Sequence, residues 1–244
     1  MTKATQTPKI RALIESNRAE ISRLINGADT VKRLNNVRWI RRELEDTEPR
    51  ALFHIKGKDQ PKFLDYSNMT NIGLAYDYIV EHLSNPIDAT EICKLHSYLC
   101  NGTYISGGIT RHTNKILEII VNGQRYHAPD PSEIPFRLNE IVYNMNNTDK
   151  DTLTRAFEAH YELIMLQPFD DFNKRTSRLV MNWVLMQGGY RPIMFNKPSE
   201  AVKYREAITA MANGDRKSYT QYMQQSLLRS QKLLLDQLKK SRII

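Results

Sequence analysis

The residues best suited to chemistry lie in one short stretch, Leu166–Arg178, which reads LQPFDDFNKRTSR. The helix before this stretch is predicted to end there, because Pro168 disfavours the helical conformation of the residue that precedes it. A new helix is predicted to begin near Asn173, since the apolar residues that follow return to helical spacing. The free backbone N–H groups of a helix start, together with the positive end of the helix dipole, favour a bound anion.

Charged side chains stand beside this helix start. Arg175 and Arg178 are three residues apart, so they are expected to lie on one face of the first turns. An arginine can hold phosphate oxygens through two parallel hydrogen bonds. Asp171, next to such phosphates, suits Mg²⁺, which prefers a carboxylate together with phosphate oxygens. The same spacing is equally compatible with an ordinary capped helix that carries solvated arginines.

Composition and charge narrow the class of protein. The chain has 244 residues, of which 41% are hydrophobic, and this is enough for one good core. The net charge of +8 permits weak attraction to acidic partners, but no zinc finger, RNP-type strand or helix-turn-helix pattern accompanies it, so nucleic acid is not the expected partner. Cys93 and Cys100 match no zinc or redox spacing. Because no apolar run approaches a membrane span, we expect a soluble, cytoplasmic protein.

Hydrophobic periodicity predicts a mostly α-helical chain with one β-hairpin. The hairpin is predicted from the segments ILEIIV and QRYH, which flank Asn122-Gly123, a pair that supplies the positive φ angles of a tight turn. The segment HIKGKDQPKF (54–63) is typical of a connector. Helices are predicted over residues 8–26, a second segment that carries Val37, Ile40 and Leu44 and ends before Pro49, and then 71–83, 88–99, 135–146, 153–165, 173–187, 201–211 and from about 217 onward.

The chain from about residue 71 to residue 222 resembles the Fic/Doc family. The central motif of that family is H-P-F-x-D/E-G-N-G-R-x-x-R. The segments GGITR (107–111), AHYELIMLQPF, MQGGYRPI and YREAITAMANGD also resemble family segments, and they occur in the same order. Within the motif, QPFDDFNKRTSR retains six positions in register, namely Pro168, Phe169, Asp171, Asn173, Arg175 and Arg178.

The resemblance implies a fold and a division of the chain. The expected fold is all-α for the most part, a Fic-fold helical bundle with one β-hairpin that serves as a flap. The Fic domain is expected at residues 61–225. An N-terminal helical extension would occupy residues 1–60, and a C-terminal helical tail would occupy residues 226–244.

The resemblance also implies an activity and its ligands. Fic proteins commonly transfer AMP from ATP to a hydroxyl of a target protein, with Mg²⁺ present; the metal position here is Asp171. The flap aligns the target by strand pairing, and its residues here are Ile119, Val121 and Gly123. The nucleotide- or phosphate-binding positions are Phe169, Asn173, Lys174, Arg175 and Arg178.

One departure from the family motif concerns the chemistry directly. The motif histidine serves as general base, and its position is occupied by Gln167. A neutral amide cannot take up a proton, and loss of general-base help typically lowers a rate by about 10²–10⁴-fold. His160, His127 and Asp170 are the nearest titratable replacements, and none of them convincingly fills the position.

Two further departures concern the phosphate loop. Phe172 and Lys174 stand where the family has glycines. The bulky Phe172 is expected to crowd the loop. Lys174 gives the N-K-R sequence of Doc-like toxins, which bind ATP in a shifted pose and transfer phosphate to a translation elongation factor.

The N-terminal segment SRLING, Ser22–Gly27, resembles the inhibitory pattern S/T-x-x-x-E-G/N of many Fic proteins. Asn26 stands where that pattern has glutamate, so a clamp on Arg178 would be a neutral hydrogen bond, weaker than an ion pair. The alternative interpretation is a plain helix end at Asn26-Gly27. Members with such a helix often form dimers, so a homodimer is also expected.

Three hypotheses follow. The first is a Fic-family protein with an ATP- or phosphate-binding loop at residues 167–178 that is impaired or inactive in AMP transfer. The second is an active AMP-transferase, or a Doc-like phosphotransferase, with an unusual mechanism. The third is a non-catalytic interaction module whose pocket Phe172 and Lys174 have closed. Under each hypothesis the partner is a protein presented at the flap, and the chain is a resident bacterial protein or an exported effector.

Overall fold

The computed structural model describes residues 6–28, 30–46, 63–147, 149–195 and 200–240. Over these residues the chain forms nine α-helices, one short 3₁₀ helix and a two-stranded hairpin, which confirms the mostly α-helical fold class. The bounds are α1 Gln6–Asn26, α2 Thr30–Asp46, α4 Phe63–Glu81, α5 Ala89–Cys100, β1 Ile116–Val121, β2 Gln124–His127, the 3₁₀ helix Pro131–Glu133, α6 Ile134–Asn146, α7 Thr152–Leu166, α8 Asn173–Gln187, α9 Glu200–Ala212 and α10 Arg216–Lys240.

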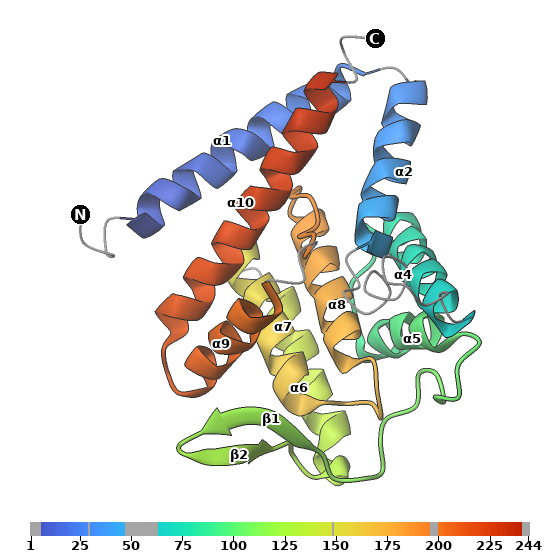
Figure 1. Ribbon diagram of the computed structural model, residues 1–244, viewed down its shortest axis with the longest axis vertical. Helices are drawn as coiled ribbons and strands as arrows, with labels where there is room; N and C mark the ends of the chain where they lie inside the picture. The colour runs from blue at the N-terminus through green and yellow to red at the C-terminus, as the bar shows by residue number, and fades with distance from the viewer. Residues whose placement is uncertain (1–5, 29, 47–62, 148, 196–199, 241–244) are drawn as a thin grey trace, which may run out of the picture.

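The helix α8 lies at the centre of the bundle, with α7 packed against it (Figure 1). Its residues from Leu179 to Met186 are all buried, so α8 is covered on every side rather than along one stripe. Trp183 in this run is fully buried. Because α8 begins at the sequence motif, the motif is attached to a helix whose middle is buried on every side.

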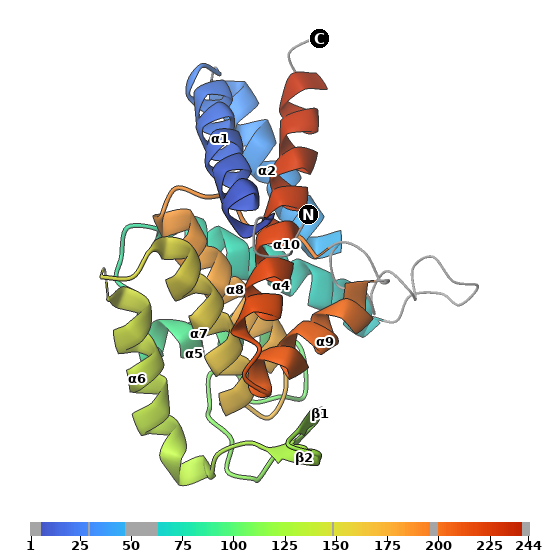
Figure 2. The same cartoon turned by 90° about the vertical axis from the view of Figure 1, so that its left-hand side faces the viewer.

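The helices α1 and α10 lie side by side and extend away from the hairpin (Figures 1 and 2). Gln231 of α10 donates a hydrogen bond to the carbonyl of Ile14 at 3.1 Å, and Lys239 pairs with Glu20 at 3.0 Å. The long helix α10 therefore serves both as part of the site and as the support for α1.

The two expected domain boundaries can be compared with the positions of the helices. The boundary at residues 60/61 lies outside the described residues. The helix α10 continues without a break through residues 225/226, so the expected tail is an extension of the same helix. A separate tail domain stays a prediction, and the structure offers no change of element at that point.

The hairpin agrees with its sequence prediction. Strands β1 and β2 are antiparallel, and the turn Asn122-Gly123 has φ angles of 51° and 81°. The pairing register shifts between Leu117 and Ile120, which marks a β-bulge or a similar irregularity of the ladder. A bulge re-aims the side chains of its strand, and here it accompanies the burial of Ile119, which is 7% exposed.

The predicted helices are confirmed, although some of their ends differ from the prediction. The helix α4 begins at Phe63, earlier than the predicted residue 71, and a 3₁₀ turn with a capping box at Asp130 precedes α6. Asp88 caps α5 by accepting a hydrogen bond from the backbone of Glu91. Among the described residues, none of the helices combines the length and the apolar character needed to cross a membrane.

Candidate functional site

The loop between α7 and α8 turns sharply at both of its ends. Gln167, at the end of α7, has φ 49°, and Phe172, at the start of α8, has φ 56°. Side chains with a Cβ rarely adopt this left-handed region, and bulky ones such as phenylalanine do so least of all. Such strain persists only where the surroundings hold the backbone in place, so the loop must have strong supports.

The first support is the guanidinium of Arg111, which is 1% exposed. The backbone N–H of Arg111 also donates to the carbonyl of Pro168 at 2.9 Å. A buried charge is tolerated when hydrogen bonds replace its water, and burial lowers the pKa of this arginine. Its side chain donates to four carbonyls, those of Gln167 at 2.6 Å, Thr113 at 2.7 Å, Pro129 at 2.6 Å and Leu166 at 3.3 Å.

The second support is the side chain of Asn173, which is 6% exposed. Its Oδ1 accepts from the backbone N–H of Phe169 at 2.9 Å, and its Nδ2 donates to the carbonyl of Phe169 at 2.7 Å. Phe169 itself is fully buried. Phe169 and Asn173 were expected to bind the ligand. In the structure they hold the loop together, and neither side chain lines the main cavity described below.

The third support is His96, to which no pattern in the sequence pointed. Its ring stacks on Phe169 with centroids 3.8 Å apart. Its Nδ1 accepts from the backbone N–H of Gly108 at 2.9 Å, so Nε2 carries the proton and donates to the carbonyl of Asp171 at 3.2 Å. Burial lowers the pKa of His96 to about 4, which keeps this ring neutral at pH 7. The ring of His96, which lies on α5, accepts one hydrogen bond and donates the other. It thereby connects the loop to α5.

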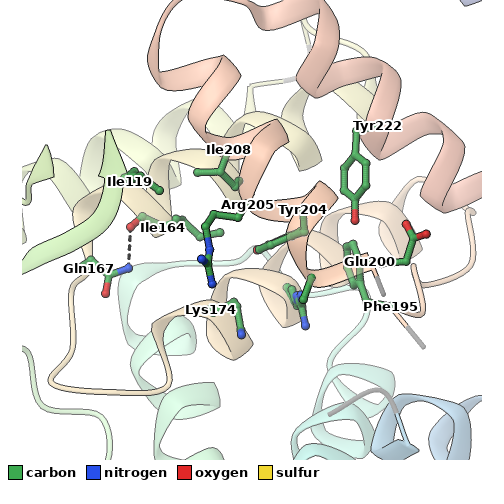
Figure 3. A pocket seen from close by; sticks show the side chains of 12 residues that line it. Ile119, Ile164, Gln167, Lys174, Phe195, Glu200, Tyr204, Arg205, Ile208 and Tyr222 are labelled. Carbon is green, nitrogen blue, oxygen red and sulfur yellow. Dashed lines mark hydrogen bonds between the residues drawn. The ribbon is translucent and has the colours of Figure 1, made fainter. Parts of the chain in front are cut away.

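A cavity of about 220 Å³ opens beside this loop. It lies between the end of α7, the start of α8, the flap, α9 and α10 (Figure 3). Its lining residues are Ile119, Ile164, Gln167, Lys174, Arg178, Phe195, Glu200, Ala201, Tyr204, Arg205, Ile208 and Tyr222.

The charged side chains of the cavity are mostly cationic. Lys174, Arg178 and Arg205 line it, together with one carboxylate, Glu200. That carboxylate pairs with Arg229 at 2.9 Å. The balance favours an anionic ligand, as the sequence predicted for this helix start. Arg205 was not predicted, because it comes from α9 and only the fold brings it to the motif.

Aromatic rings fix the position of Arg178. Its guanidinium carbon lies 4.3 Å from the ring centroid of Phe195 and 4.6 Å from that of Tyr204. Both distances are within the range of a cation–π contact. The cavity thus combines a cationic part with a flat aromatic part, to which Tyr222 also contributes.

Gln167 lines the cavity from the side of α7. Its Nε2 donates to the carbonyl of Ile164 at 2.7 Å, as the dashed line in Figure 3 shows. The only carboxylate that lines the cavity within the described chain, Glu200, lies on the opposite side from Gln167 (Figure 3). Among the described residues that line the cavity, no carboxylate or imidazole therefore lies beside Gln167.

The three expected flap residues, Ile119, Val121 and Gly123, do not share one environment. Ile119 lines the main cavity, whereas Val121 lines a neighbouring cavity of about 410 Å³ that also includes Tyr126. Gly123 occupies the turn. The outer edge of β1 is bonded to the side chain of Asn213, which accepts from the N–H of Asn122 at 3.0 Å and donates to the carbonyl of Ile120 at 2.9 Å.

Arg175 and Phe172 lie on a different side of the start of α8. The guanidinium carbon of Arg175 is 4.8 Å from the ring centroid of Phe172, and neither side chain lines the main cavity. Arg175 does share a smaller cavity, of about 30 Å³, with Arg178 and with Leu44 of α2. The expectation that Phe172 crowds the loop is therefore not met on the cavity side, because its ring faces Arg175.

The expected metal position, Asp171, is exposed, and its Oδ1 accepts from the N–H of Phe172 at 2.7 Å. Among the described residues, no group of three or more His, Cys, Asp or Glu side chains is placed to hold a metal ion. A Mg²⁺ ion that is held mainly by phosphate oxygens and water needs only one or two carboxylates. Asp171 fits that limited requirement.

The three residues that the sequence offered as replacements for the general base lie outside the cavity lining. His160 is fully buried, between the hydroxyls of Tyr204 and Tyr219, and burial lowers its pKa to about 3. His127 is exposed at the end of β2, and Asp170 is exposed in the loop. None of the three lines the cavity.

The segment Ser22–Gly27 lies far from Arg178, which corrects the expected inhibitory contact of Asn26. Glu20, in the same part of α1, pairs with Lys239 near the end of α10. Lys239 is nearly five helical turns beyond Tyr222, or roughly 25 Å along the helix, and Tyr222 lines the cavity. The apolar stripe of α1 is buried against α10, and this packing directs Ser22, Asn26 and Gly27 away from the site.

The fold and the site together define a class: a helical bundle in which a hairpin flap and a helix start enclose a cationic cavity. Residues 86–185 match the family model for the Fic/DOC family. This part of the chain is therefore similar to the Fic/DOC family.

Known proteins of this family show how far the similarity extends. Over 165 residues, or 65% of this chain, the sequence is 30% identical to the protein adenylyltransferase Fic of Drosophila melanogaster, but the match covers 32% of that relative. The chain thus spans about a third of the length of the curated relatives it matches.

Solved structures agree on the fold. A Fic domain containing signaling protein from Bacteroides thetaiotaomicron is 17% identical, with a TM-score of 0.78 over 93% of this chain and 97% of that one. IbpAFic2, in a structure where it is covalently tethered to Cdc42, is 16% identical, with a TM-score of 0.53 over 84% of this chain and 72% of that one. At these identities the structures establish the shared fold.

Proposed function

We propose that this protein binds a nucleoside triphosphate at loop 167–178 and is impaired in AMP transfer to target-protein hydroxyls. The observation that carries the proposal is the pairing of a cationic cavity with Gln167 at the position of the missing base. Relatives named protein adenylyltransferase support the reaction class. The cavity lining supports the ligand, and the amide of Gln167 accounts for the impairment.

The charge distribution supports a triphosphate in a definite orientation. Lys174, Arg178 and Arg205 would receive phosphate oxygens, since all three line one cavity. The rings of Phe195 and Tyr222 offer a flat apolar surface for a base. A volume of about 220 Å³ is below the roughly 300–1,000 Å³ of ordinary small-molecule sites, so a bound nucleotide would extend beyond the mouth of the cavity.

The chemistry of Gln167 supports a low transfer rate. One N–H of its amide donates to the carbonyl of Ile164, and Oε1 is the only atom of the amide that can accept a hydrogen bond from a hydroxyl. An amide oxygen can orient that hydroxyl but cannot remove its proton at neutral pH. We expect a rate that is about 10²–10⁴-fold below that of a variant with histidine at this position.

Magnesium would be held by Asp171 together with the phosphates. The ion would neutralise charge on the triphosphate, and the exposed carboxylate supplies the hard oxygen ligand that Mg²⁺ prefers. The role of the protein here is limited to one carboxylate and to the placement of the phosphates by Arg178 and Lys174.

A protein target at the flap is the proposed partner. The known structure of IbpAFic2 tethered to Cdc42 supports a protein as the target class. In this chain Asn213 already bonds Ile120 and Asn122 on the outer edge of β1. A target strand that pairs with this edge would have to pair beside that contact or replace it. A homodimer, and residence in the cytoplasm or export as an effector, stay predictions from the family resemblance.

A second candidate function has one specific observation in its favour. Lys174 lines the cavity, as expected if the N-K-R sequence places the nucleotide in the shifted pose of Doc-like members and favours phosphate transfer. The third hypothesis, a closed module, has less support. The cavity is open, and Phe172 does not line it.

Two experiments test the proposal. Thermal unfolding with ATP and Mg²⁺ should show stabilisation of about 2.7 kcal/mol at 100 times Kd, and Lys174→Ala should weaken it, whereas no shift at millimolar ATP would favour the closed module. Incubation of a cell extract with α-labelled or γ-labelled ATP then separates the reactions. Label from the α position only indicates AMP transfer, and label from the γ position only indicates the Doc-like alternative.

A further inference from the structure

We infer that His160 is a positioning residue for the anion cavity: through the hydroxyl of Tyr204 it fixes the ring that holds Arg178. The inference deepens the proposed function, on which it rests for the identity of the bound anion. The geometry of the network, by contrast, stands on the contacts alone.

The network crosses the core of the bundle from α7 to α9 and α10. His160 is fully buried. Its Nδ1 lies 2.8 Å from the hydroxyl of Tyr219, and its Nε2 lies 2.8 Å from the hydroxyl of Tyr204. The hydroxyl of Tyr219 in turn donates to the carbonyl of Phe157 at 2.7 Å. Three side chains from three helices are thus connected in one line.

The direction of every bond in this line is determined. Tyr219 has one hydroxyl proton, which it gives to the carbonyl of Phe157, so it accepts from the Nδ1–H of His160. A neutral imidazole has a single N–H, and burial together with the charge of Arg178 keeps His160 neutral. Nε2 is therefore an acceptor, and Tyr204 must donate its hydroxyl proton to it.

The hydrogen bond to His160 holds Tyr204 by its hydroxyl, and the ring of Tyr204 contacts Arg178. The guanidinium carbon of Arg178 lies 4.3 Å and 4.6 Å from the ring centroids of Phe195 and Tyr204. Its Nε is buried and has no hydrogen-bond partner among the described residues. The rings therefore contribute much of what places this guanidinium, and the ring of Tyr204 is anchored through its hydroxyl.

The same geometry separates His160 from the role of a replacement base. Its pKa of about 3 makes it a weak proton acceptor at neutral pH, and general-base help needs a pKa near the working pH. Tyr204 also stands between the imidazole and the cavity. The contribution of His160 is consequently one of position.

The test compares two buried tyrosines, one inside the cavity lining and one outside it. Tyr204→Phe keeps the ring and removes the anchor. Tyr78→Phe is the matched control, because Tyr78 is buried, its hydroxyl donates one hydrogen bond to Glu91 at 2.6 Å, and it does not line the cavity. The probe is inorganic pyrophosphate, titrated by calorimetry at a temperature where all variants are folded. We expect Kd to rise about threefold to tenfold in Tyr204→Phe, as for one lost hydrogen bond, and to stay unchanged in Tyr78→Phe.

A second readout reports position directly. The ¹⁵N resonances of His160 should show a protonated Nδ1 and an unprotonated Nε2. The Nε–H resonance of Arg178 should shift or broaden in Tyr204→Phe and stay in place in Tyr78→Phe. His160→Gln, which can still donate to Tyr219 and accept from Tyr204, should retain more pyrophosphate affinity than His160→Phe.

The outcomes separate the two proposals. If the two tyrosine variants behave alike in the Arg178 resonance, or if His160 carries its proton on Nε2, the positioning role is refuted. If the parent binds no pyrophosphate while the Arg178 resonance responds to Tyr204→Phe alone, the positioning role stands and the anion site of the proposed function fails.

Discussion

Acidification from pH 7.5 to pH 4.5 should destabilise the protein through two buried histidines. His96 and His160 have pKa values lowered to about 4 and about 3, in each case mainly by burial. In the unfolded chain a histidine has a pKa of about 6.5. Between these values the unfolded state binds more protons than the folded state, so the free energy of unfolding falls as the pH falls. The stabilising contribution is fully present above pH 6.5.

The magnitude follows from the separation of the pKa values. Each histidine should contribute a slope approaching 1.4 kcal/mol per pH unit below pH 6.5. Over the interval to pH 4.5 the loss is then about 2–3 kcal/mol for each ring, which is a large part of the 5–15 kcal/mol of an ordinary domain. The carboxylates with lowered pKa values, such as Asp130 and Asp151, add their loss at lower pH.

Urea unfolding at several pH values measures this slope. The parent is compared with His160→Gln, which removes one titrating ring and keeps a donor and an acceptor in its place. The variant should lose about half of the pH dependence between pH 6.5 and pH 4.5. A parent whose free energy of unfolding is level across this interval, or a variant with the full slope of the parent, would show that these buried histidines do not cause the loss of stability in acid.

Three further substitutions test the supports and ligands of the loop. Arg111→Met should destabilise the fold by about 3 kcal/mol or more, because four carbonyls lose their donor. Chemical denaturation measures the free energy of unfolding. A loss below about 1 kcal/mol would contradict the supporting role of Arg111. Asn173→Ala should cost about 2 kcal/mol of stability and also weaken ATP binding, since both bonds to Phe169 disappear; unchanged ATP affinity would show that the loop keeps its shape without them. Arg205→Ala should raise the Kd for ATP about tenfold with little change in stability. The control is Arg216→Ala, because Arg216 is exposed and pairs with Glu158. Equal effects of the two substitutions on the Kd would show that Arg205 does not bind ATP.

Local patterns in the sequence predicted the elements well. The hairpin followed from β-branched segments around Asn122-Gly123, and both residues have the positive φ that this turn requires. The start of α8 at Asn173 followed from the return of apolar spacing after Pro168. These features are decided by residues within a few positions of one another, which is the range that sequence patterns cover.

The site was only partly predictable, because much of it is assembled over long distances in the sequence. Gln167 and Lys174 are placed by the motif itself. Arg205 and His96 reach the loop only through the packing of α9 and α5. Asn173 was expected to bind the ligand, yet its two amide atoms satisfy the backbone of Phe169, and a residue type alone does not reveal which partner it will find.

The placement of α1 shows the same limit. Its apolar stripe predicted a helix correctly, but a stripe does not identify the surface that covers it. The motif-like segment Ser22–Gly27 suggested a contact with Arg178. The stripe instead packs on α10, and the contact between Glu20 and Lys239 places that segment roughly 25 Å from the cavity.

The most direct test of the account is the ratio of two labelling rates. The parent and Gln167→His are incubated with α-labelled ATP, Mg²⁺ and the same extract, and the initial rate of label incorporation into protein is measured for each. We predict that the histidine variant labels at least about 100-fold faster than the parent, while both bind ATP with similar affinity. Equal rates of labelling in the parent and the variant would contradict it.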